Sequence, residues 1–265
     1  MCPSTEKKEM RKVIYTCITG GYDTLRQPDV VDPSYDYICY SDDFKDEKVG
    51  VWTIRRIPFS NDDATRRSRY VKILPHKVLG EYDISVWMDA SFVITDRSFY
   101  DALERKINSG CLEAHLPHPL RDCVYEEIVR CYLDTRISFM DAVRQWRHLS
   151  GSGFPRHFGL LENGLMLRRH NDPRVIRISE EWWKEYMTFS SRDQLVLMPV
   201  FWKEGFMPDL LLGEGVNSTN APCVRLDKHP GQLKARNITG FRRLPLKARW
   251  TWRKFVAGLV FEKIK

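Results

Sequence analysis

Short apolar runs alternate with helical segments along the first two hundred residues, and this alternation restricts the fold more than any other feature. The apolar runs predicted to be strands cover 13–18, 35–40, 51–57, the stretch from 82 to Asp89, 111–116 and 158–168. Helices are predicted over 64–79 with a break at Pro75, then over 98–107, 124–133, 139–149 and 180–189. Strands that alternate with helices form a mainly parallel sheet covered on both faces. We therefore predict an α/β fold of this kind.

Length and composition are compatible with one large domain. The chain has 265 residues, 43% of them hydrophobic, which is enough for a substantial core. No repeat or long linker interrupts its first part, so we expect a domain over 1–212 and a basic extension over 213–265. The seven cysteines are odd in number and include no C-x-x-C pair, which indicates reduced thiols. With no signal peptide and no spanning segment in the sequence, we expect a cytoplasmic protein.

The positive charge is concentrated in the extension. Residues 242–265 contain eight Lys or Arg and one acidic residue, a net charge of +7 that equals that of the whole chain. Nucleic-acid binding normally spreads basic residues over the folded domain, so we expect no nucleic-acid partner. Within 247–264 a helical stripe carries Trp252, Phe255, Val256, Leu259 and Val260. Such a helix either docks on the domain or lies on an anionic membrane surface.

Asp89 ends an apolar run in Tyr82-Asp83-Ile84-Ser85-Val86-Trp87-Met88-Asp89. Ligands bind at the carboxyl ends of strands in α/β sheets. A carboxylate in that position can hold a divalent cation against a diphosphate, since Mg²⁺ needs only one or two protein carboxylates when phosphates complete its shell. The alternative is a turn residue that closes a buried strand.

Basic side chains recur in the preceding helix. Arg66, Arg69 and Lys72 follow one another at steps of three and share one helix face. They can converge on phosphate groups, or they can form a solvated face.

Three further polar groups interrupt or follow apolar segments. Glu162 and Asn163 stand inside a strand, where a buried charge is costly unless it has a partner or faces a cleft. Glu162 is therefore a candidate acid or base, although Asn163-Gly164 also suggests a hairpin or a bulge. In Arg192-Asp193-Gln194 the aspartate is a candidate base, with a helix N-cap as the alternative. A loop after the strand at 111–116 brings His118, Arg121 and Glu126 together.

Taken in their order along the chain, these motifs resemble those of one glycosyltransferase-like family. This family includes plant mucilage-related proteins, a protein described as an alkaline ceramidase, and bacterial polysaccharide-cluster proteins. The resemblance covers 12–202 and rests on Tyr15-Thr16-Cys17-Ile18-Thr19-Gly20-Gly21-Tyr22-Asp23, Arg66, Ser68-Arg69-Tyr70, Lys72, Trp87-Met88-Asp89, His118-Pro119 with Arg121, Cys123 and Glu126, Glu162-Asn163-Gly164 and Arg192-Asp193-Gln194.

The resemblance implies a GT-A type fold, a nucleotide-sugar donor and Mn²⁺ or Mg²⁺. It places on the donor side Thr19, Gly20, Gly21, Tyr22, Asp42, Arg66, Arg69, Lys72, Asp89 and Ser91. It places on the acceptor side His118, Arg121, Glu126, Asn163, Arg192 and Gln194. Asp193 or Glu162 would be the catalytic base, and Asp89 with His229 would bind the metal. Ser91 stands where a D-x-D motif has its second carboxylate, so the sequence does not imply an obligatory metal.

The implied activity is a hexosyltransferase-type glycosyltransferase that acts in surface polysaccharide synthesis on a glycan or lipid-linked acceptor. It would be cytoplasmic, or peripheral at the inner face of a membrane through its basic tail. Two alternatives are a hydrolase of an amide-linked lipid and a noncatalytic basic membrane-binding protein.

Overall fold

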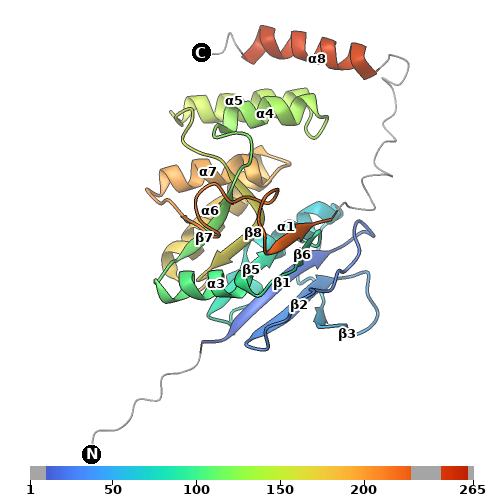
Figure 1. Ribbon diagram of the computed structural model, residues 1–265. Coiled ribbons are helices and arrows are strands. Elements are labelled where there is room, and N and C mark those ends of the chain that lie inside the picture. Colours follow the sequence, from blue (N-terminus) through green and yellow to red (C-terminus); the bar gives the residue numbers. More distant parts are fainter. Residues whose placement is uncertain (1–9, 228–245, 262–265) are drawn as a thin grey trace, which may run out of the picture.

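The central sheet has eight strands, and its middle is parallel. The computed structural model describes residues 10–227 and 246–261 (Figure 1). The sheet order is β3 (Lys48–Val49), β4 (Trp52–Arg55), β2 (Tyr35–Ser41), β1 (Lys12–Ile18), β5 (Ile84–Met88), β8 (Leu161–Arg168), β7 (Glu113–Pro117) and β9 (Asp209–Leu210). Strands β4, β2, β1 and β5 run parallel, whereas β8 is antiparallel to β5 and β7. The predicted α/β class is confirmed.

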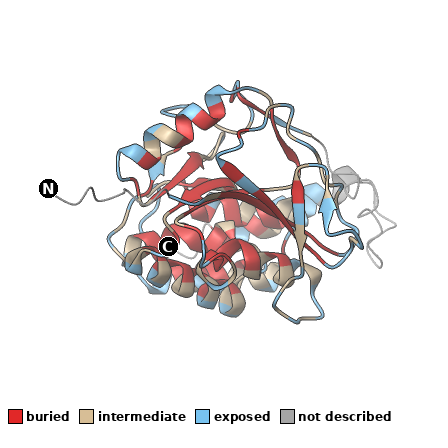
Figure 2. Ribbon diagram, turned by 90° about the horizontal axis from the view of Figure 1, so that it is seen from below, coloured by how far each residue is buried: buried red, intermediate tan, exposed pale blue. Residues whose placement is uncertain are grey.

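Helices pack on both faces of the sheet, as predicted, and leave the strands buried between them (Figure 2). Because side chains alternate along a strand, Val13 and Tyr15 enter one core while Ile14 and Ile18 enter the other. The first core includes α1 (Ala64–Ile73), α4 (Val124–Leu133), α5 (Phe139–Gly151), α6 (Pro173–Phe189) and α7 (Gln194–Lys203). The second includes α3 (Ser98–Asn108) and the small sheet of β6 (Phe92–Ile94) and β10 (Val224–Leu226).

Several element boundaries differ from the prediction for local reasons. The helix predicted over 64–79 breaks as expected, with α2 (Pro75–Val78) starting at the proline. Asp63 caps α1 by accepting hydrogen bonds from backbone amides. Helix α6 starts well before residue 180, since the side chain of Asp172 caps its first turn.

Glu162 and Asn163 lie within β8, so the hairpin alternative is wrong and the bulge alternative is confirmed. Between His115 and Leu116 the register of β7 jumps from Met166 to Glu162. A bulge of this kind re-aims side chains next to functional sites.

Two elements of the chain after residue 212 contact the domain. Strand β10 pairs with β6, and helix α8 (Leu246–Phe261) lies over α4 and α5 at the top of Figure 1. The ring of Phe261 lies 5.0 Å from that of Trp146, and the Arg253 guanidinium lies 4.6 Å from the Tyr132 ring. None of the described helices has the length and apolar character needed to cross a membrane.

Candidate active site

A pocket of about 610 Å³ opens where β1 and β5 end. Its walls come from the turn after β1, the turn after β5, the first half of α1 and two arginines from other loops. The lining residues are Cys17, Ile18, Thr19, Gly20, Tyr22, Asp23, Ala64, Thr65, Ser68, Arg69, Trp87, Asp89, Ala90, Arg136 and Arg192. The carboxyl ends of adjacent parallel strands therefore form the pocket floor, as the position of Asp89 predicted.

A buried ammonium group joins two carboxylates beside this pocket. The Nζ atom of Lys72 lies 2.8 Å from Asp193 Oδ2 and 3.6 Å from Asp89 Oδ1. Arg69 Nε lies 3.1 Å from the other oxygen of Asp193. The indole nitrogen of Trp87 donates to Asp89 Oδ1 at 2.8 Å. Four predicted site residues and Trp87 thus form one connected network.

Asp193 is a fully ionised carboxylate in this network. Burial by itself would raise its pKa, but the charges of Arg69 and Lys72 outweigh that effect and hold the pKa far below its ordinary value. Asp193 stands at the N-cap position of α7, as the N-cap alternative predicted, but its side chain makes no cap hydrogen bond and pairs with Lys72 and Arg69 instead. A carboxylate with such a low pKa takes up a proton poorly near neutral pH.

Arg192 and Arg136 bring positive charge to the pocket wall. The Nε atom of Arg192 is buried and has no hydrogen-bond partner among the described residues. Arg136 has a long ion pair with Asp134, at 3.8 Å. Sequence reasoning missed Arg136, because it lies in the loop after α4 and no local pattern connects that loop to the ends of β1 and β5.

The turn after β1 uses a carboxylate that sequence reasoning also missed. Gly20 and Gly21 have φ values of 70° and 62°, and their amides donate to the two oxygens of Asp43 at 3.2 and 2.9 Å. Asp42 does not line the pocket and instead pairs with Arg67 at 3.7 Å. Arg67 also donates to the hydroxyl of Thr19, which fixes this wall.

Five of the ten predicted donor-side residues lie outside the pocket lining, namely Gly21, Asp42, Arg66, Lys72 and Ser91. Ser91 is buried, and its carbonyl accepts a hydrogen bond from the amide of Asp227. Arg66 points to Asp63, with Nε 3.9 Å from its carboxylate. Helix α1 turns about 100° per residue, so residues three apart drift around it, and only part of the predicted basic face reaches the pocket.

Glu162 lies close enough to Asp89 to be influenced by its charge. The Asp89 amide donates to the carbonyl of Gly164, two residues after Glu162 on β8. Ser218 donates to Glu162 from its amide, at 2.9 Å, and from its hydroxyl, at 2.7 Å. Burial raises the pKa of Glu162 above its ordinary value, the Ser218 hydrogen bonds lower it, and the charge of Asp89 raises it further.

The predicted acceptor-side residues do not all gather at the pocket. His118 Nδ1 accepts from the amides of its own loop, and Arg121 pairs with Glu127 at 2.6 Å. Gln194 donates to the carbonyl of Leu161. Asn163 is buried, and its amide group has no partner among the described residues. Of this set, only Arg192 lines the pocket.

The described residues do not complete a metal site around Asp89. Asp23 and Asp89 are the acidic residues in the pocket lining, and Asp23 pairs with Arg26 at 2.8 Å. No group of three ligating side chains in the described ranges includes Asp89. Lys72 already supplies a positive charge to its carboxylate. The other predicted ligand, His229, lies outside the described residues.

Comparisons with solved structures give several glycosyltransferases. Mouse xyloside xylosyltransferase 1 in its apo form is 11% identical, with a TM-score of 0.44 over 76% of this chain and 84% of that chain. Core-mannan synthase A from Aspergillus fumigatus, in its Mn/GDP form, is 8% identical, with a TM-score of 0.45 over 75% and 71%. The apo bifunctional glycosyltransferase WbbM is 9% identical, with a TM-score of 0.42 over 77% of this chain and 39% of that chain. Among curated proteins there is no match.

Assignment to a family rests on the sequence match and not on these distant structures. The model of one family, described as TOD1/MUCI70, glycosyltransferase-like domain, matches residues 3–208. That range covers most of the chain and contains every pocket-lining residue. The resemblance expected from the ordered motifs is thereby confirmed, and this chain belongs to the TOD1/MUCI70 glycosyltransferase-like family.

Proposed function

We propose that this chain transfers a sugar, of the hexose type, from a nucleotide-sugar donor to a hydroxyl group of a glycan or lipid-linked acceptor in surface polysaccharide synthesis. The observation that carries the proposal is the charge arrangement of the pocket. Arg136 and Arg192 lie on its wall, and the Nε of Arg192 is buried without a partner in the described chain. A buried N–H group lacking an acceptor is costly unless a ligand provides one, and a diphosphate matches the geometry of a guanidinium group.

The two arginines would act on the leaving group. When the bond between the anomeric carbon and the diphosphate oxygen breaks, negative charge grows on that oxygen. Preorganised cations aimed at the growing charge stabilise the transition state in a water-poor site. Asp89, held by Trp87 and Lys72, would orient the sugar through its hydroxyl groups. No step is assigned to a metal, because the described residues do not complete a site for one.

Of the two predicted bases, the electrostatics favour Glu162. A general base works best when its pKa lies near the working pH, and the pKa of Glu162 is raised whereas that of Asp193 is strongly lowered. If the reaction inverts the anomeric centre, Glu162 takes the proton of the acceptor hydroxyl as its oxygen bonds to the anomeric carbon. If it retains the configuration, the departing phosphate takes that proton. Asp193 would instead position Lys72 and Arg69.

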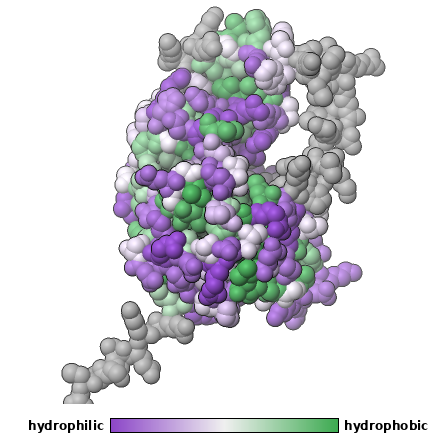
Figure 3. Space-filling view, viewed as in Figure 1, coloured by the Kyte–Doolittle hydropathy of each residue, from purple (hydrophilic) through white to green (hydrophobic). Residues whose placement is uncertain are grey.

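Helix α8 supports an additional proposal, that the protein binds an anionic membrane surface. Ala257 and Phe261 are buried against the domain, whereas Trp252, Phe255 and Leu259 are exposed. The predicted stripe does not form one buried face of α8. Three of its residues are exposed, and the other two, Val256 and Val260, are partly buried. Figure 3 shows hydrophobic residues exposed on α8 at the top of the molecule. A helix with exposed aromatic residues in a segment of net charge +7 suits a membrane interface.

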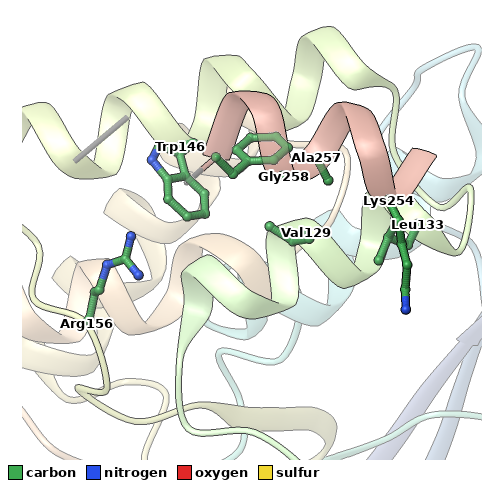
Figure 4. Close-up of a pocket in the computed structure, with 8 residues that line it drawn as sticks. Val129, Leu133, Trp146, Arg156, Lys254, Ala257 and Gly258 are labelled. Carbon is green, nitrogen blue, oxygen red and sulfur yellow. The ribbon is translucent and has the colours of Figure 1, made fainter. Parts of the chain in front are cut away.

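The inner side of α8 leaves a second cavity of about 680 Å³ against α4 and α5. Figure 4 shows Val129 of α4 and Trp146 of α5 facing the side of α8 that carries Ala257 and Gly258. Docking through this side explains how α8 remains attached to the domain while its outer side stays available. The cytoplasmic location expected from the sequence is part of the same proposal.

A thermal-shift screen of nucleotide sugars, each with and without Mn²⁺, tests the transferase proposal. A ligand that binds the native state raises its apparent stability by mass action. We expect one donor to raise the melting temperature of the full chain, and this shift to be lost in Arg192→Gln. Arg177→Gln, a change to an exposed ion pair on α6, is the matched control and should keep the shift. Failure of every nucleotide to shift the wild type would overturn the proposal.

Hydrolysis of an amide-linked lipid stays a prediction without a supporting observation at this pocket. Such a reaction needs an activated water, and no triad of metal-ligating side chains lines the pocket in the described chain.

A further inference from the structure

Three chemically different metal ligands converge away from the donor pocket. A ring nitrogen of His157, the thiol sulfur of Cys123 and a carboxylate oxygen of Glu126 all lie within 4.8 Å of one another. Cys123 and Glu126 belong to the N-terminus of α4, whereas His157 comes from the loop between α5 and β8. None of the three lines the pocket at Asp89.

The histidine is oriented in the way that metal-binding histidines usually are. His157 Nδ1 lies 2.8 Å from Asp122 Oδ1, so this nitrogen is engaged in a hydrogen bond with the carboxylate. The other nitrogen, Nε2, faces Glu126 with 3.9 Å between Nε2 and Oε1. A carboxylate behind a histidine fixes its tautomer and raises its basicity toward a metal. The Gly159 amide also donates to the Asp122 carbonyl, which holds the loop against the start of α4.

The cysteine stands in a position where a different residue would stabilise the helix better. Cys123 is the N-cap of α4, and its side chain makes no capping hydrogen bond. Ser, Thr, Asp and Asn are preferred there by about 1 kcal/mol over residues that cannot cap. The sulfur is nevertheless buried and turned to Glu126 and His157. The thiolate is the form of cysteine that binds metals.

We propose that Cys123, Glu126 and His157 bind a zinc ion, with Asp122 as the partner that orients His157. Thiolate, imidazole and carboxylate are all zinc ligands, whereas the thiolate disfavours Mg²⁺ and Ca²⁺. The three ligand atoms, within 4.8 Å of one another, would close around the ion, and water would take the fourth position of the tetrahedron. The ion would clamp the loop before β8 onto α4, and β8 carries Glu162. This inference does not depend on the proposed transferase reaction.

Cobalt(II) provides a direct test, because a cobalt–thiolate bond absorbs light where the apoprotein does not. The full chain is stripped of metal by chelation and titrated with Co²⁺. We expect a thiolate charge-transfer band that saturates at one equivalent and disappears when Zn²⁺ is added. The band should be absent in Cys123→Ser and retained in Cys223→Ser, a matched change at another buried free cysteine.

Two exposed substitutions keep the test valid if the buried cysteine variant folds poorly. His157 has φ 56°, a conformation that asparagine tolerates, so His157→Asn should fold while losing the band and the stabilisation by Zn²⁺. Asp122→Asn removes only the orienting partner and should weaken cobalt affinity by about 10- to 100-fold while keeping the band. Absence of a thiolate band in the wild type, or an unchanged band in His157→Asn, would overturn the proposal.

Discussion

Ser218 donates two hydrogen bonds to the carboxylate of Glu162, at 2.9 Å from its amide and 2.7 Å from its hydroxyl. A segment beyond the predicted domain boundary thus holds the residue that we propose as the base. The hydroxyl bond stabilises the charged form and lowers the pKa of Glu162.

Replacing Ser218 by alanine should therefore shift the pH dependence of the reaction. Losing one hydrogen bond to a charged group is equivalent to roughly one pKa unit. A base must be deprotonated to act, so raising its pKa moves the acidic limb of kcat/KM to higher pH. Thr219→Ala, which removes a hydroxyl bonded only within the loop, should leave the limb in place. A pH profile of Ser218→Ala that superimposes on the wild type would remove Glu162 from the role of base.

Asp193→Asn separates a positioning role from a catalytic one. Removing one partner of a buried ion pair leaves uncompensated charge and costs on the order of 3–5 kcal/mol, so urea unfolding should shift strongly. Because Arg69 and Lys72 depress the pKa of Asp193, its contribution is present above the ordinary aspartate pKa and is lost as the pH falls below it. Asp209→Asn breaks an exposed pair with Lys106 and should cost less than about 1 kcal/mol. Lost activity at unchanged stability would instead support Asp193 as the base.

Asp89→Asn should abolish donor turnover while leaving the fold intact. Asparagine still offers Trp87 an oxygen acceptor, and the half-exposed position avoids a large burial penalty. The charge that orients the sugar is lost, however, and we expect the rate of donor hydrolysis to fall at least about 100-fold, the range typical of groups that act on the transition state. The measurement is nucleotide release with melting temperature as the control. Wild-type turnover in Asp89→Asn would exclude Asp89 from the mechanism.

Much of this site could be predicted from the sequence, because the pattern of apolar residues indicates where a strand ends and which residues share a helix face. An apolar run that ends on a carboxylate predicts a strand end, and the position of Asp89 follows. The shared helix face of Arg69 and Lys72 follows from helical spacing, but of the three basic residues at this spacing only Arg69 lines the pocket; Lys72 lies beside it and Arg66 points away. Sequence spacing gives the angular order of side chains on a helix, but the tilt of that helix on the sheet decides which of them reach a ligand.

The remaining parts depend on tertiary packing. Arg136 and Ser218 lie in loops, where no repeat period relates a residue to a distant strand end. Helix α7 is buried on nearly all sides, so its sequence lacks the alternation of polar and apolar positions that identifies a helix. The metal-ligand cluster of His157 with Cys123 joins positions that only the folding of the loop onto α4 brings together.

The buried imidazole of His170 should make the folded state less stable in acid. Burial lowers its pKa from 6.5 to about 4, and its Nε2 faces the carbonyl of Leu79 at 2.9 Å. Above pH 6.5 the histidine is neutral in both states. As the pH falls toward 4, the unfolded state takes up a proton that the folded state does not, so stability falls by roughly 3 kcal/mol. In His170→Gln this loss should be absent, and chemical unfolding between pH 7 and 4 measures it. Parallel stability curves for the two proteins would contradict the prediction.

The split surface of α8 gives a prediction about membranes. Replacing Trp252 and Phe255 by serine removes two exposed side chains, at 56% and 58% exposure, that we propose insert between lipids. Each contributes about 1.5–3 kcal/mol on burial, so binding to phosphatidylserine-containing vesicles should weaken on the order of a hundredfold or more. The melting temperature should not change, because neither side chain packs on the domain. Leu120→Ser with Met207→Ser, which removes two exposed hydrophobic side chains elsewhere, should leave vesicle binding intact. Equal losses in both double variants would mean that general surface hydrophobicity, and not α8, drives the association.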